Sequence, residues 1–414
     1  MNSINDLGRK AKKASKKIAV AGEEKNKALK AIAEALINKA NDIVSANKID
    51  IKNAKNNGLT DAFIDRLTLS DERIKMMSEG IFKIISFEDP IGRVLEGHVT
   101  KEGLHINNVS VPIGVIGIIY ESRPNVTVDA AALCLKAGNA VILRGGKESI
   151  NSNLCLCRIM REAIKSVGLP EDCIQLVEDT SRQSANDLMC LTDYLDVLIP
   201  RGGAGLIRSV TNNSRVPVIK TGEGNCHVYV DEFADINMAA DIIYNAKTSR
   251  PSVCNAIETI LVHENIAPKA LPIIRKRLSE KNVELRCCEK AFNILGEGVL
   301  KANEEDWATE FLDYILAVKV VSSIDEAILH IEKYSTGHSE AIITNDYLNA
   351  RKFVSKVDSA AVYVNASTRF TDGGEFGMGA EIGISTQKLH ARGPMGLNQL
   401  TSNKFIITGD GQIR

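Results

Sequence analysis

Apolar residues recur at helical spacing near the start of the chain. Between Ile4 and Ile18, five apolar side chains are separated by three or four residues, which places them on one face of an amphipathic helix. A second set with similar spacing runs from Leu29 to Val44. The lysines of the first segment are expected to form the solvated face of its helix. The pattern therefore predicts that residues 1–100 are helical.

From Val115 the pattern changes to short apolar strands that alternate with amphipathic helices. Successive βαβ units of this size predict a parallel sheet covered by helices on both faces. The Gly-rich tail after Ile382 contains one further β-like stretch. We expect an α/β fold with strands at 115–120, 140–143, 174–177, 196–199, 258–262, 315–321, 341–343, 361–364 and 404–408, and helices at 128–136, 151–167, 184–190, 235–246 and 268–281 and from 206.

Size and charge narrow the class of protein. The chain has 414 residues, more than one ordinary core accommodates, so two or three domains are expected. Lys and Arg total 51 against 52 Asp and Glu, a balance that argues against a dedicated nucleic-acid-binding protein. The longest apolar run, Val111–Ile119, is nine residues and too short to span a membrane. The sequence thus predicts a globular protein without nucleic-acid or membrane partners.

Two loops combine glycines with cations. Arg144-Gly145-Gly146-Lys147 follows a predicted strand and precedes a predicted helix, where glycines let the backbone approach a phosphate and the helix start offers N–H groups. The two cations favour NADP(H), with its additional phosphate, over NAD. Arg201-Gly202-Gly203-Ala204-Gly205 repeats the arrangement one crossover later. Neither loop is a GxGxxG or Walker A motif, so a charged surface turn is the alternative interpretation.

The nine cysteines form no disulfide framework, because their number is odd and their spacing irregular. Without an export signal, we expect reduced thiols in a cytoplasmic protein. Most should be small buried residues. The cysteines in apolar helical patterns, and therefore expected in the core, are Cys134, Cys155, Cys157 and Cys190.

Cys254 is the predicted nucleophile, since the chain has no obvious Ser-His-Asp pattern. It lies in the polar segment Arg250–Asn255, directly before a strand, and Arg250 would favour its thiolate. Cys226 also lies in a polar loop, next to His227, but sequence neighbours need not face each other. His330 and His338 are expected to be structural, and no motif predicts a metal site.

Several segments closely resemble the gamma-glutamyl phosphate reductases, a family within the aldehyde dehydrogenase superfamily. Tyr120-Glu121-Ser122-Arg123-Pro124-Asn125 and the loop that follows at Leu143–Glu148 carry the likeness in the first half. Thr221–His227, the signature from Val321 to Glu340, and Arg392–Leu397 carry it in the second. The resemblance covers nearly the whole chain.

The resemblance implies NADPH-dependent reduction of L-glutamyl 5-phosphate to L-glutamate 5-semialdehyde and phosphate, the second step of L-proline biosynthesis. In this likeness Cys254 matches the catalytic cysteine that forms a thioester, and Asn125 looks like the amide that stabilises the oxyanion. Glu310 is similar to the glutamate that holds the nicotinamide ribose. Among the loop cations, we expect Arg123 or Arg250 to receive the acyl phosphate and Arg369, with Glu375, to lie nearer the amino-acid end.

The family's architecture further implies three parts. These are an NADP-binding domain at 1–100 and 114–225, a catalytic domain at 226–385, and a small β oligomerisation flap at 101–113 and 386–414. A homo-oligomer is expected, and association with the glutamate 5-kinase that makes the unstable substrate is a further possibility that the family suggests.

The sequence differs from the hydrolytic aldehyde dehydrogenases at one catalytic position. Those enzymes carry a general-base glutamate there, and the resemblance places Lys220 at that position in this chain. Without that base a thioester would survive until hydride reaches it, which favours reduction of an acyl phosphate. The alternatives are an NAD(P)-dependent aldehyde dehydrogenase or acyl-CoA reductase acting on another small substrate, and a non-catalytic scaffold. A kinase-like nucleotide-binding protein is disfavoured because no Walker A lysine-serine pair is present.

Overall fold

The computed structural model describes residues 3–414, which fall into two compact units. The first unit extends to Thr221 and includes Gly377–Gly383 and Met395–Arg414. The second unit comprises Gly222–Phe376 and Ile384–Pro394. Each unit contains its own parallel sheet and its own buried cluster, as the α/β prediction requires.

Helices occupy the first part of the first unit, as predicted, but only as far as Ser86. The prediction was wrong for Val94–Val99, which forms strand β1. Pro90 and Gly92 interrupt the helical pattern, and every residue of β1 is exposed, so no alternation marks it as a strand. The five helices are α1 (Ile4–Ile18), α2 (Glu24–Asn38), α3 (Ala40–Asn56), α4 (Asp61–Leu67) and α5 (Asp71–Ser86).

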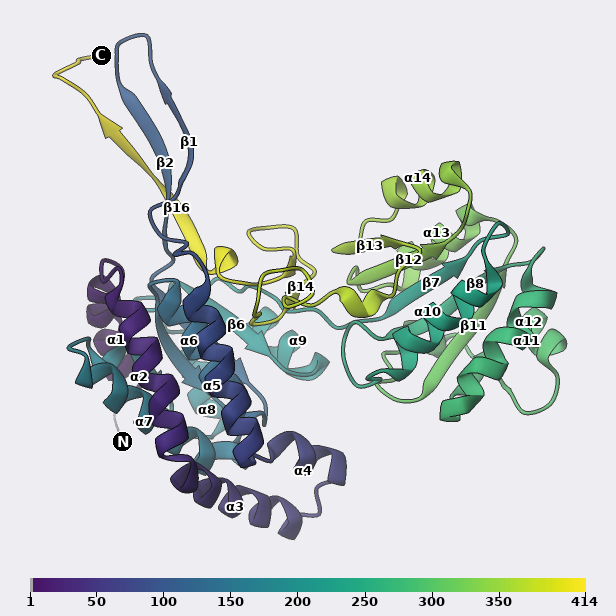
Figure 1. Cartoon of the computed structure of the whole chain (residues 1–414), viewed down its shortest axis with the longest axis horizontal. Helices are drawn as coiled ribbons and strands as arrows, with labels where there is room; N and C mark the ends of the chain where they lie inside the picture. Colours follow the sequence, from purple (N-terminus) through teal and green to yellow (C-terminus); the bar gives the residue numbers. More distant parts are fainter. Residues whose placement is uncertain (1–2) are drawn as a thin grey trace. The chain divides into compact units, whose positions relative to one another are not determined.

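The sheet of the first unit has four parallel strands in the order β5-β4-β3-β6. Helix α1 packs on one face of it together with α8 and α9, and α6 and α7 contact its strands as well (Figure 1). The strands are β3 (Val115–Tyr120), β4 (Ala140–Arg144), β5 (Ile174–Leu176) and β6 (Val197–Arg201), and the helices are α6 (Pro124–Lys136), α7 (Ile150–Ser166), α8 (Arg182–Met189) and α9 (Ala204–Asn213).

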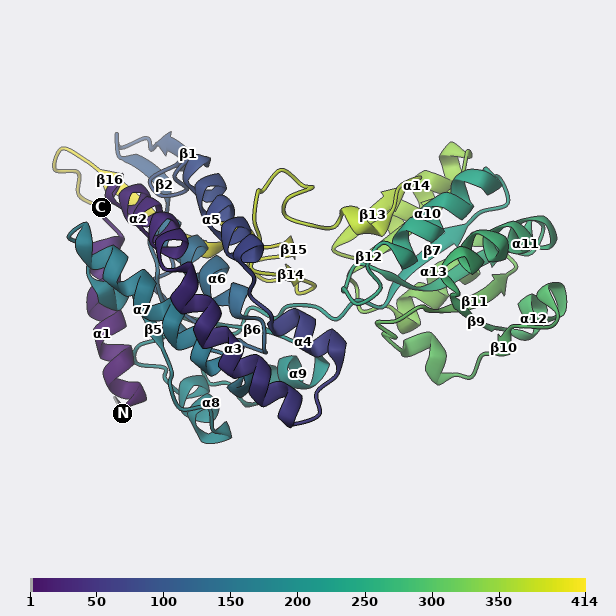
Figure 2. The same cartoon turned by 60° about the horizontal axis from the view of Figure 1, so that its bottom comes forward.

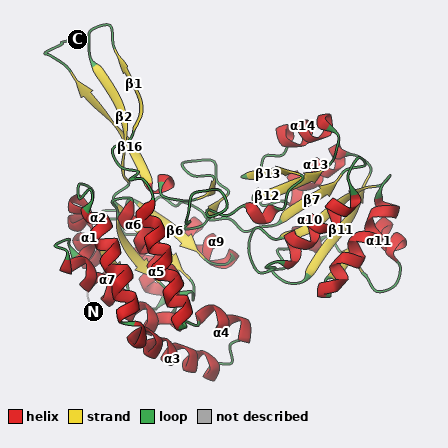
Figure 3. Cartoon of the chain, viewed as in Figure 1, coloured by secondary structure: helices red, strands yellow, loops and turns green. Residues whose placement is uncertain are grey.

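A separate antiparallel sheet of three strands also belongs to the first unit. Its order is β1-β2-β16, with β2 at His105–Pro112 and β16 at Thr401–Thr408 (Figure 3). Leu95, Phe405 and Ile407 are more than half exposed. The sheet thus joins part of each segment predicted as a flap, 105–112 and 401–408, with β1, which the sequence did not place there. Residues 386–394, also predicted in the flap, belong to the second unit.

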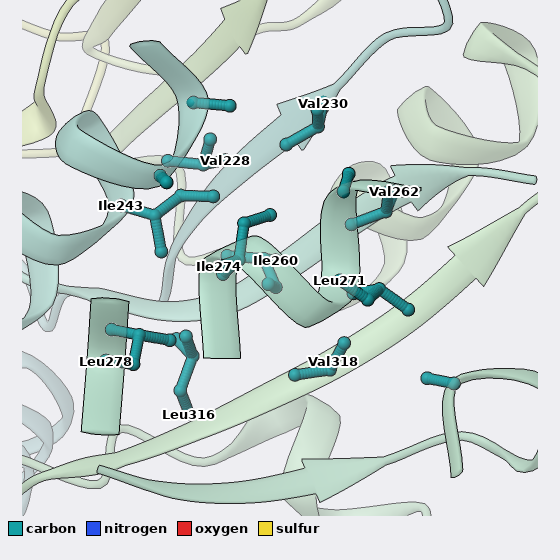
Figure 4. Close-up of a cluster of buried hydrophobic side chains, with 14 of the residues drawn as sticks. Val228, Val230, Ile243, Ile260, Val262, Leu271, Ile274, Leu278, Leu316 and Val318 are labelled. Carbon is teal, nitrogen blue, oxygen red and sulfur yellow. The ribbon is translucent and has the colours of Figure 1, made fainter. Parts of the chain in front are cut away.

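The second unit is built on seven parallel strands in the order β10-β9-β11-β8-β7-β12-β13. Val228, Ile260 and Val318 on one face pack under α10 and α11 (Figure 4), and Tyr229 and Leu261 on the other face pack against residues of α13 and α14. Figure 2 shows these four helices around the strands of the sheet. The strands are β7 (Cys226–Val230), β8 (Ile257–His263), β9 (Glu284–Cys287), β10 (Leu300–Lys301), β11 (Ile315–Val321), β12 (Ser339–Ile343) and β13 (Ala361–Val364). The helices are α10 (Ile236–Thr248), α11 (Ala267–Leu278), α12 (Glu289–Leu295), α13 (Ile324–Tyr334) and α14 (Tyr347–Lys356), and the short strands β14 (Ile384–Ser385) and β15 (Gly393–Pro394) form an antiparallel pair.

All nine cysteines are free thiols. Cys134 and Cys157 are buried as predicted, but Cys155 is only partly buried and Cys190 is exposed. Cys190 was misplaced because it is the C-cap residue of α8, beyond the last turn that faces the core. Within residues 3–414, no helix is both long enough and apolar enough to cross a bilayer.

Candidate active site

The predicted nucleophile lies on a turn between α10 and β8, at the amino end of the second unit's sheet. Cys254 is partly buried there. The neighbouring strands β7 and β12 begin at Cys226 and Ser339, so their amino ends lie beside the same turn. Three segments far apart in the sequence therefore meet at Cys254.

The segment before β7 packs directly on the backbone of Cys254. The Cys226 thiol donates a hydrogen bond to the Cys254 carbonyl oxygen, with sulfur and oxygen 3.2 Å apart. A Cβ atom added at Gly224 would lie 1.5 Å from that oxygen, which no side chain tolerates. Only glycine therefore fits at position 224, a requirement of this close approach.

Asn255, which follows Cys254 on the same turn, forms hydrogen bonds to the loop after β13. Its side-chain amide donates to the carbonyl oxygens of Thr371 at 3.0 Å and Arg369 at 3.3 Å. Its own carbonyl oxygen accepts from the hydroxyl of Thr368 at 2.7 Å. Sequence analysis missed Asn255 as a site residue, because an asparagine in a polar loop carries no signal of its tertiary partners.

Two predicted substrate residues lie near the nucleophile. The Arg369 guanidinium donates from Nε to the hydroxyl of Ser249 at 2.9 Å and from Nη1 to the side-chain oxygen of Asn255. Burial lowers the pKa of Arg369 and the cation of Arg250 lowers it further, whereas the Cys254 thiol acts in the opposite direction. Arg250 and Arg369 thus bring two positive charges close to Cys254.

Glu310 contacts the segment that precedes β7. Its carboxylate accepts a hydrogen bond from the backbone N–H of Gly224 at 2.8 Å. Burial raises the pKa of Glu310, and the charge of Glu223 adds to the effect. Glu375, by contrast, lies on an exposed turn-rich segment.

A buried ion pair lies behind the turn, and sequence analysis missed it. Lys247 of α10 and Glu258 of β8 are 2.5 Å apart and both side chains are fully buried. Burial raises the pKa of Glu258 to about 7, although Lys247 opposes the shift. Glu258 also accepts from the N–H of Leu312, so it connects the turn to the loop that carries Glu310.

His227 does not face the nucleophile. Successive residues of β7 point to opposite faces of the sheet, and the His227 side chain donates from Nδ1 to buried Glu340, 3.1 Å away. His330 is also buried, and burial lowers its pKa to about 2. Within residues 3–414, no group of His, Cys, Asp and Glu is arranged to hold a metal ion.

In the first unit, the predicted phosphate loop lies at the carboxyl end of β4. The Arg144 guanidinium donates to the carbonyl oxygens of Thr180 at 2.7 Å and Ser181 at 2.9 Å, and burial lowers its pKa. Lys147, in contrast, is exposed on the 3-10 turn that follows the two glycines. Arg144 is therefore engaged by the protein, whereas Lys147 faces solvent.

The helix after this loop does not offer all of its N–H groups to a ligand, as the sequence had suggested. The buried Asp50 carboxylate accepts from the backbone N–H groups of Asn151 and Ser152 and from both of their side chains. These N–H groups are not available to a ligand, because a carboxylate at a helix N-terminus satisfies the same N–H groups that a phosphate would.

The second glycine loop is more open. A Cβ atom at Gly203 would have its nearest neighbour, Glu121 Oε1, 3.8 Å away, and one at Gly205 would have no atom within 4 Å. The Glu121 carboxylate accepts from the N–H of Gly203 at 3.1 Å, whereas Gly202 packs against the Glu121 side chain. The open space at Gly203 and Gly205 would admit a dinucleotide phosphate at the start of α9, where the N–H of Gly203 now bonds to Glu121.

Asn125 lies in the first turn of α6 rather than in a loop. Helix α6 begins at Pro124, a favoured residue for the first helical position, and Arg123 is its N-cap. The Asn125 amide is exposed and donates to Asp129 at 3.0 Å. Burial raises the pKa of Asp129 to about 6, although the hydrogen bond from Asn125 and the charge of Arg201 oppose it.

The structure thus gathers the predicted residues in two groups. Cys254, Arg250, Arg369 and Glu310 lie around one turn of the second unit. The remaining predicted residues, apart from Glu375, follow the carboxyl ends of β3, β4 and β6 in the first unit, where parallel α/β sheets bind ligands; they are Arg123, Asn125, Arg144, Gly145, Gly146, Lys147, Gly202 and Gly203.

Comparisons with known proteins agree with the fold and with the motifs. A model of the aldehyde dehydrogenase family matches residues 2–290. A gamma-glutamyl phosphate reductase from Clostridium perfringens is 59% identical over 414 residues, which covers all of both chains.

Solved structures give the same picture. The crystal structure of gamma-glutamyl phosphate reductase from Thermotoga maritima superimposes with a TM-score of 0.98 at 50% identity, again over all of both chains. An engineered glycolyl-CoA reductase with bound NADP+ has a TM-score of 0.70 at 17% identity over 99% of this chain and 97% of its own, and this likeness concerns the fold. The chain belongs to the aldehyde dehydrogenase family and, within it, to the gamma-glutamyl phosphate reductases.

Proposed function

We propose that this protein reduces L-glutamyl 5-phosphate to L-glutamate 5-semialdehyde and phosphate with NADPH, the second step of L-proline biosynthesis. The observation that carries the proposal is the 59% identity, over the full length, to a relative named for this activity. The turn around Cys254 supports it, because a thiol beside two guanidinium groups suits an anionic acyl donor.

In the first step, the Cys254 thiolate attacks the γ-carbonyl carbon of the substrate. A C–S bond forms, the C–O bond to the phosphoryl group breaks, and phosphate leaves with the bonding electron pair. The product is a thioester on Cys254. The nearby Arg369 cation favours the thiolate that starts the reaction.

Charge on the carbonyl oxygen needs hydrogen-bond donors during this attack. We assign this role to the backbone N–H of Cys254 and the side-chain amide of Asn125. One such donor is typically worth about 2.7–4 kcal/mol of transition-state stabilisation. The bond from Asn125 to Asp129 orients the amide, since it uses one of its two N–H groups and leaves the other for the substrate.

In the second step, the thioester carbon would accept a hydride, which bound NADPH would supply. The C–S bond then breaks, its electron pair returns to the Cys254 sulfur as a thiolate, and L-glutamate 5-semialdehyde is released. The second glycine loop and Gly145-Gly146 would hold its phosphates, and Glu310 its nicotinamide ribose. A preference for NADPH over NADH rests on exposed Lys147, since Arg144 already donates to main-chain carbonyls. Lys220, in place of a general base, leaves water unactivated and preserves the thioester for reduction.

We assign substrate recognition to the arginines of the loops. Arg250 or Arg123 would receive the acyl phosphate, and Arg369 with Glu375 would bind the amino-acid end. We further propose a homo-oligomer formed through the exposed strands β1, β2 and β16, association with glutamate 5-kinase, and a cytoplasmic location in keeping with nine free thiols.

The test runs the reaction backwards with L-glutamate 5-semialdehyde, phosphate and NADP+, following absorbance of the reduced nicotinamide. We expect a signal that requires phosphate and disappears in Cys254→Ala, while NADPH binding by that variant stays close to wild type. A phosphate-independent signal would favour the alternative of an ordinary aldehyde dehydrogenase, and full activity of Cys254→Ala would exclude the thioester. NAD+ in place of NADP+ measures the cofactor preference.

A further inference from the structure

A series of buried polar contacts begins at the backbone carbonyl oxygen of the nucleophile, Cys254. The Cys226 thiol, which bonds to the Cys254 carbonyl oxygen, lies 3.7 Å from Nδ1 of His338. The same nitrogen lies 2.8 Å from the hydroxyl of Ser339. His338 and Ser339 are fully buried and belong to the signature segment, to which the proposed mechanism gives no role.

Further polar contacts lead from Ser339 back to the residue that follows the nucleophile. The Ser339 hydroxyl is 2.7 Å from that of Thr371, which is also 2.7 Å from the hydroxyl of Tyr363. The Thr371 carbonyl oxygen accepts from Asn255, the residue that follows Cys254. These contacts close a ring, which we call the polar ring; its members are Cys254, Cys226, His338, Ser339, Thr371 and Asn255.

The polar ring carries no charged side chain apart from a Cys254 thiolate. Burial lowers the pKa of His338 to about 4, so this imidazole is neutral at physiological pH. Burial also raises the pKa of Cys226 well above its usual value, which keeps that thiol protonated and able to donate. Buried polar groups that bond to one another restrict the geometry of the segments they join. Within residues 3–414, Nε2 of His338 has no hydrogen-bond partner, so His338 joins the ring through Nδ1 alone.

We propose that Ser339 and Thr371 are positioning residues for the nucleophile. They link the residues on the two sides of Cys254, and so fix the position of the turn relative to Arg369, whose guanidinium bonds to Asn255. This inference rests on the proposed function, in which Cys254 attacks the substrate. Neither hydroxyl touches the substrate, so both act through the backbone and side chains of the turn.

The informative variant is Thr371→Val, because it preserves shape and removes only the hydroxyl with its two contacts. Ser339→Ala removes the neighbouring link, and Thr371→Ser restores a hydroxyl at 371. A matched control is Thr344→Val at the opposite end of β12. Buried Thr344 also makes two hydroxyl contacts, to Asp231 and to the N–H of Asp346, but lies outside the ring.

Three measurements separate positioning from general destabilisation. The first is the rate at which iodoacetamide alkylates Cys254 as a function of pH, resolved by mass spectrometry with exposed Cys190 as internal reference. The second is kcat together with KM for NADPH. The third is unfolding monitored by fluorescence of Trp307, the only tryptophan, which lies in the same unit.

For Thr371→Val and Ser339→Ala we expect kcat to fall by about ten- to a hundredfold, with KM for NADPH unchanged. The midpoint of Cys254 alkylation should move to higher pH, because the thiol is no longer held beside Arg369. Thr371→Ser should restore both properties. Thr344→Val should lose stability to a similar extent and keep the wild-type alkylation profile.

Wild-type alkylation and kcat in Thr371→Val would overturn the proposal, as would equal losses in Thr344→Val. Failure of the proposed function would look different. In that case Cys254→Ala would keep its turnover, whereas a failed ring proposal leaves Cys254→Ala inactive and Thr371→Val normal.

Discussion

The buried pair of Lys247 and Glu258 gives a prediction whose size follows from the structure. In Lys247→Met the ammonium group is removed while the Glu258 carboxylate stays in a fully buried position. Removing one partner of a buried ion pair typically costs about 3–5 kcal/mol, because an uncompensated charge remains. For a unit of this size, that corresponds to a fall in Tm of roughly 6–20 °C.

The loss should depend on pH in a defined direction. Burial raises the pKa of Glu258 above its ordinary value of 4.5, and Lys247 opposes this shift, so its removal raises the pKa further. The folded variant then binds a proton that the unfolded chain releases. Its stability is retained below about pH 4.5 and decreases as pH rises, by up to about 1.4 kcal/mol per pH unit until the folded pKa is passed.

Urea unfolding at pH 5 and pH 8, followed by Trp307 fluorescence, measures both effects in the second unit. The control is Lys290→Met, which breaks an exposed pair with Glu264 and should leave the free energy of unfolding nearly unchanged at either pH. If Lys247→Met were as stable as the control, or equally destabilised at both pH values, the carboxylate would not be desolvated and the reasoning would be wrong.

Three further predictions concern other parts of the molecule. Gly224→Ala should lower kcat at least about tenfold, since its Cβ would overlap the Cys254 carbonyl oxygen, whereas Gly80→Ala in the open middle of α5 should stabilise the protein by about 0.5–1 kcal/mol. Asp50→Ala should destabilise the first unit by about 2 kcal/mol through loss of the α7 cap, seen by circular dichroism; an unchanged Tm would contradict this. Phe405→Glu, on the exposed strand β16, should shift light scattering towards smaller species, and an unchanged mass would exclude this sheet from the oligomer.

The sequence predicted most accurately the helices and strands whose hydrophobic pattern allows a single interpretation. Strand β3 lies at the predicted residues 115–120, because a strand buried on both faces needs no polar position and therefore shows as a continuous apolar segment. Strand β1 was missed for the opposite reason, since all of its residues are exposed and no periodicity marks them. Cys254 was selected as a candidate by its chemistry and loop context, and its role remains a prediction for experiment.

Residues that support the nucleophile were beyond sequence reasoning. Asn255 and Thr371 are 116 positions apart, and nothing in either segment indicates that they pair. Lys247 lies on a helix whose pattern would assign a lysine to solvent, yet it is buried because β8 places a carboxylate opposite it. Such contacts depend on the tertiary arrangement of strands and are absent from any local pattern.

The division into two units separates the proposed site for the dinucleotide phosphates from the polar ring. Gly203 and Lys147, which we assign to the dinucleotide, belong to the first unit, and the polar ring lies wholly within the second. A substitution at Ser339 should therefore change the reactivity of Cys254 without changing the affinity for NADPH, and a substitution at Lys147 should do the reverse. If both changed both properties, the cofactor and the nucleophile would be coupled through the chain, and the ring could no longer be regarded as a local device of the second unit.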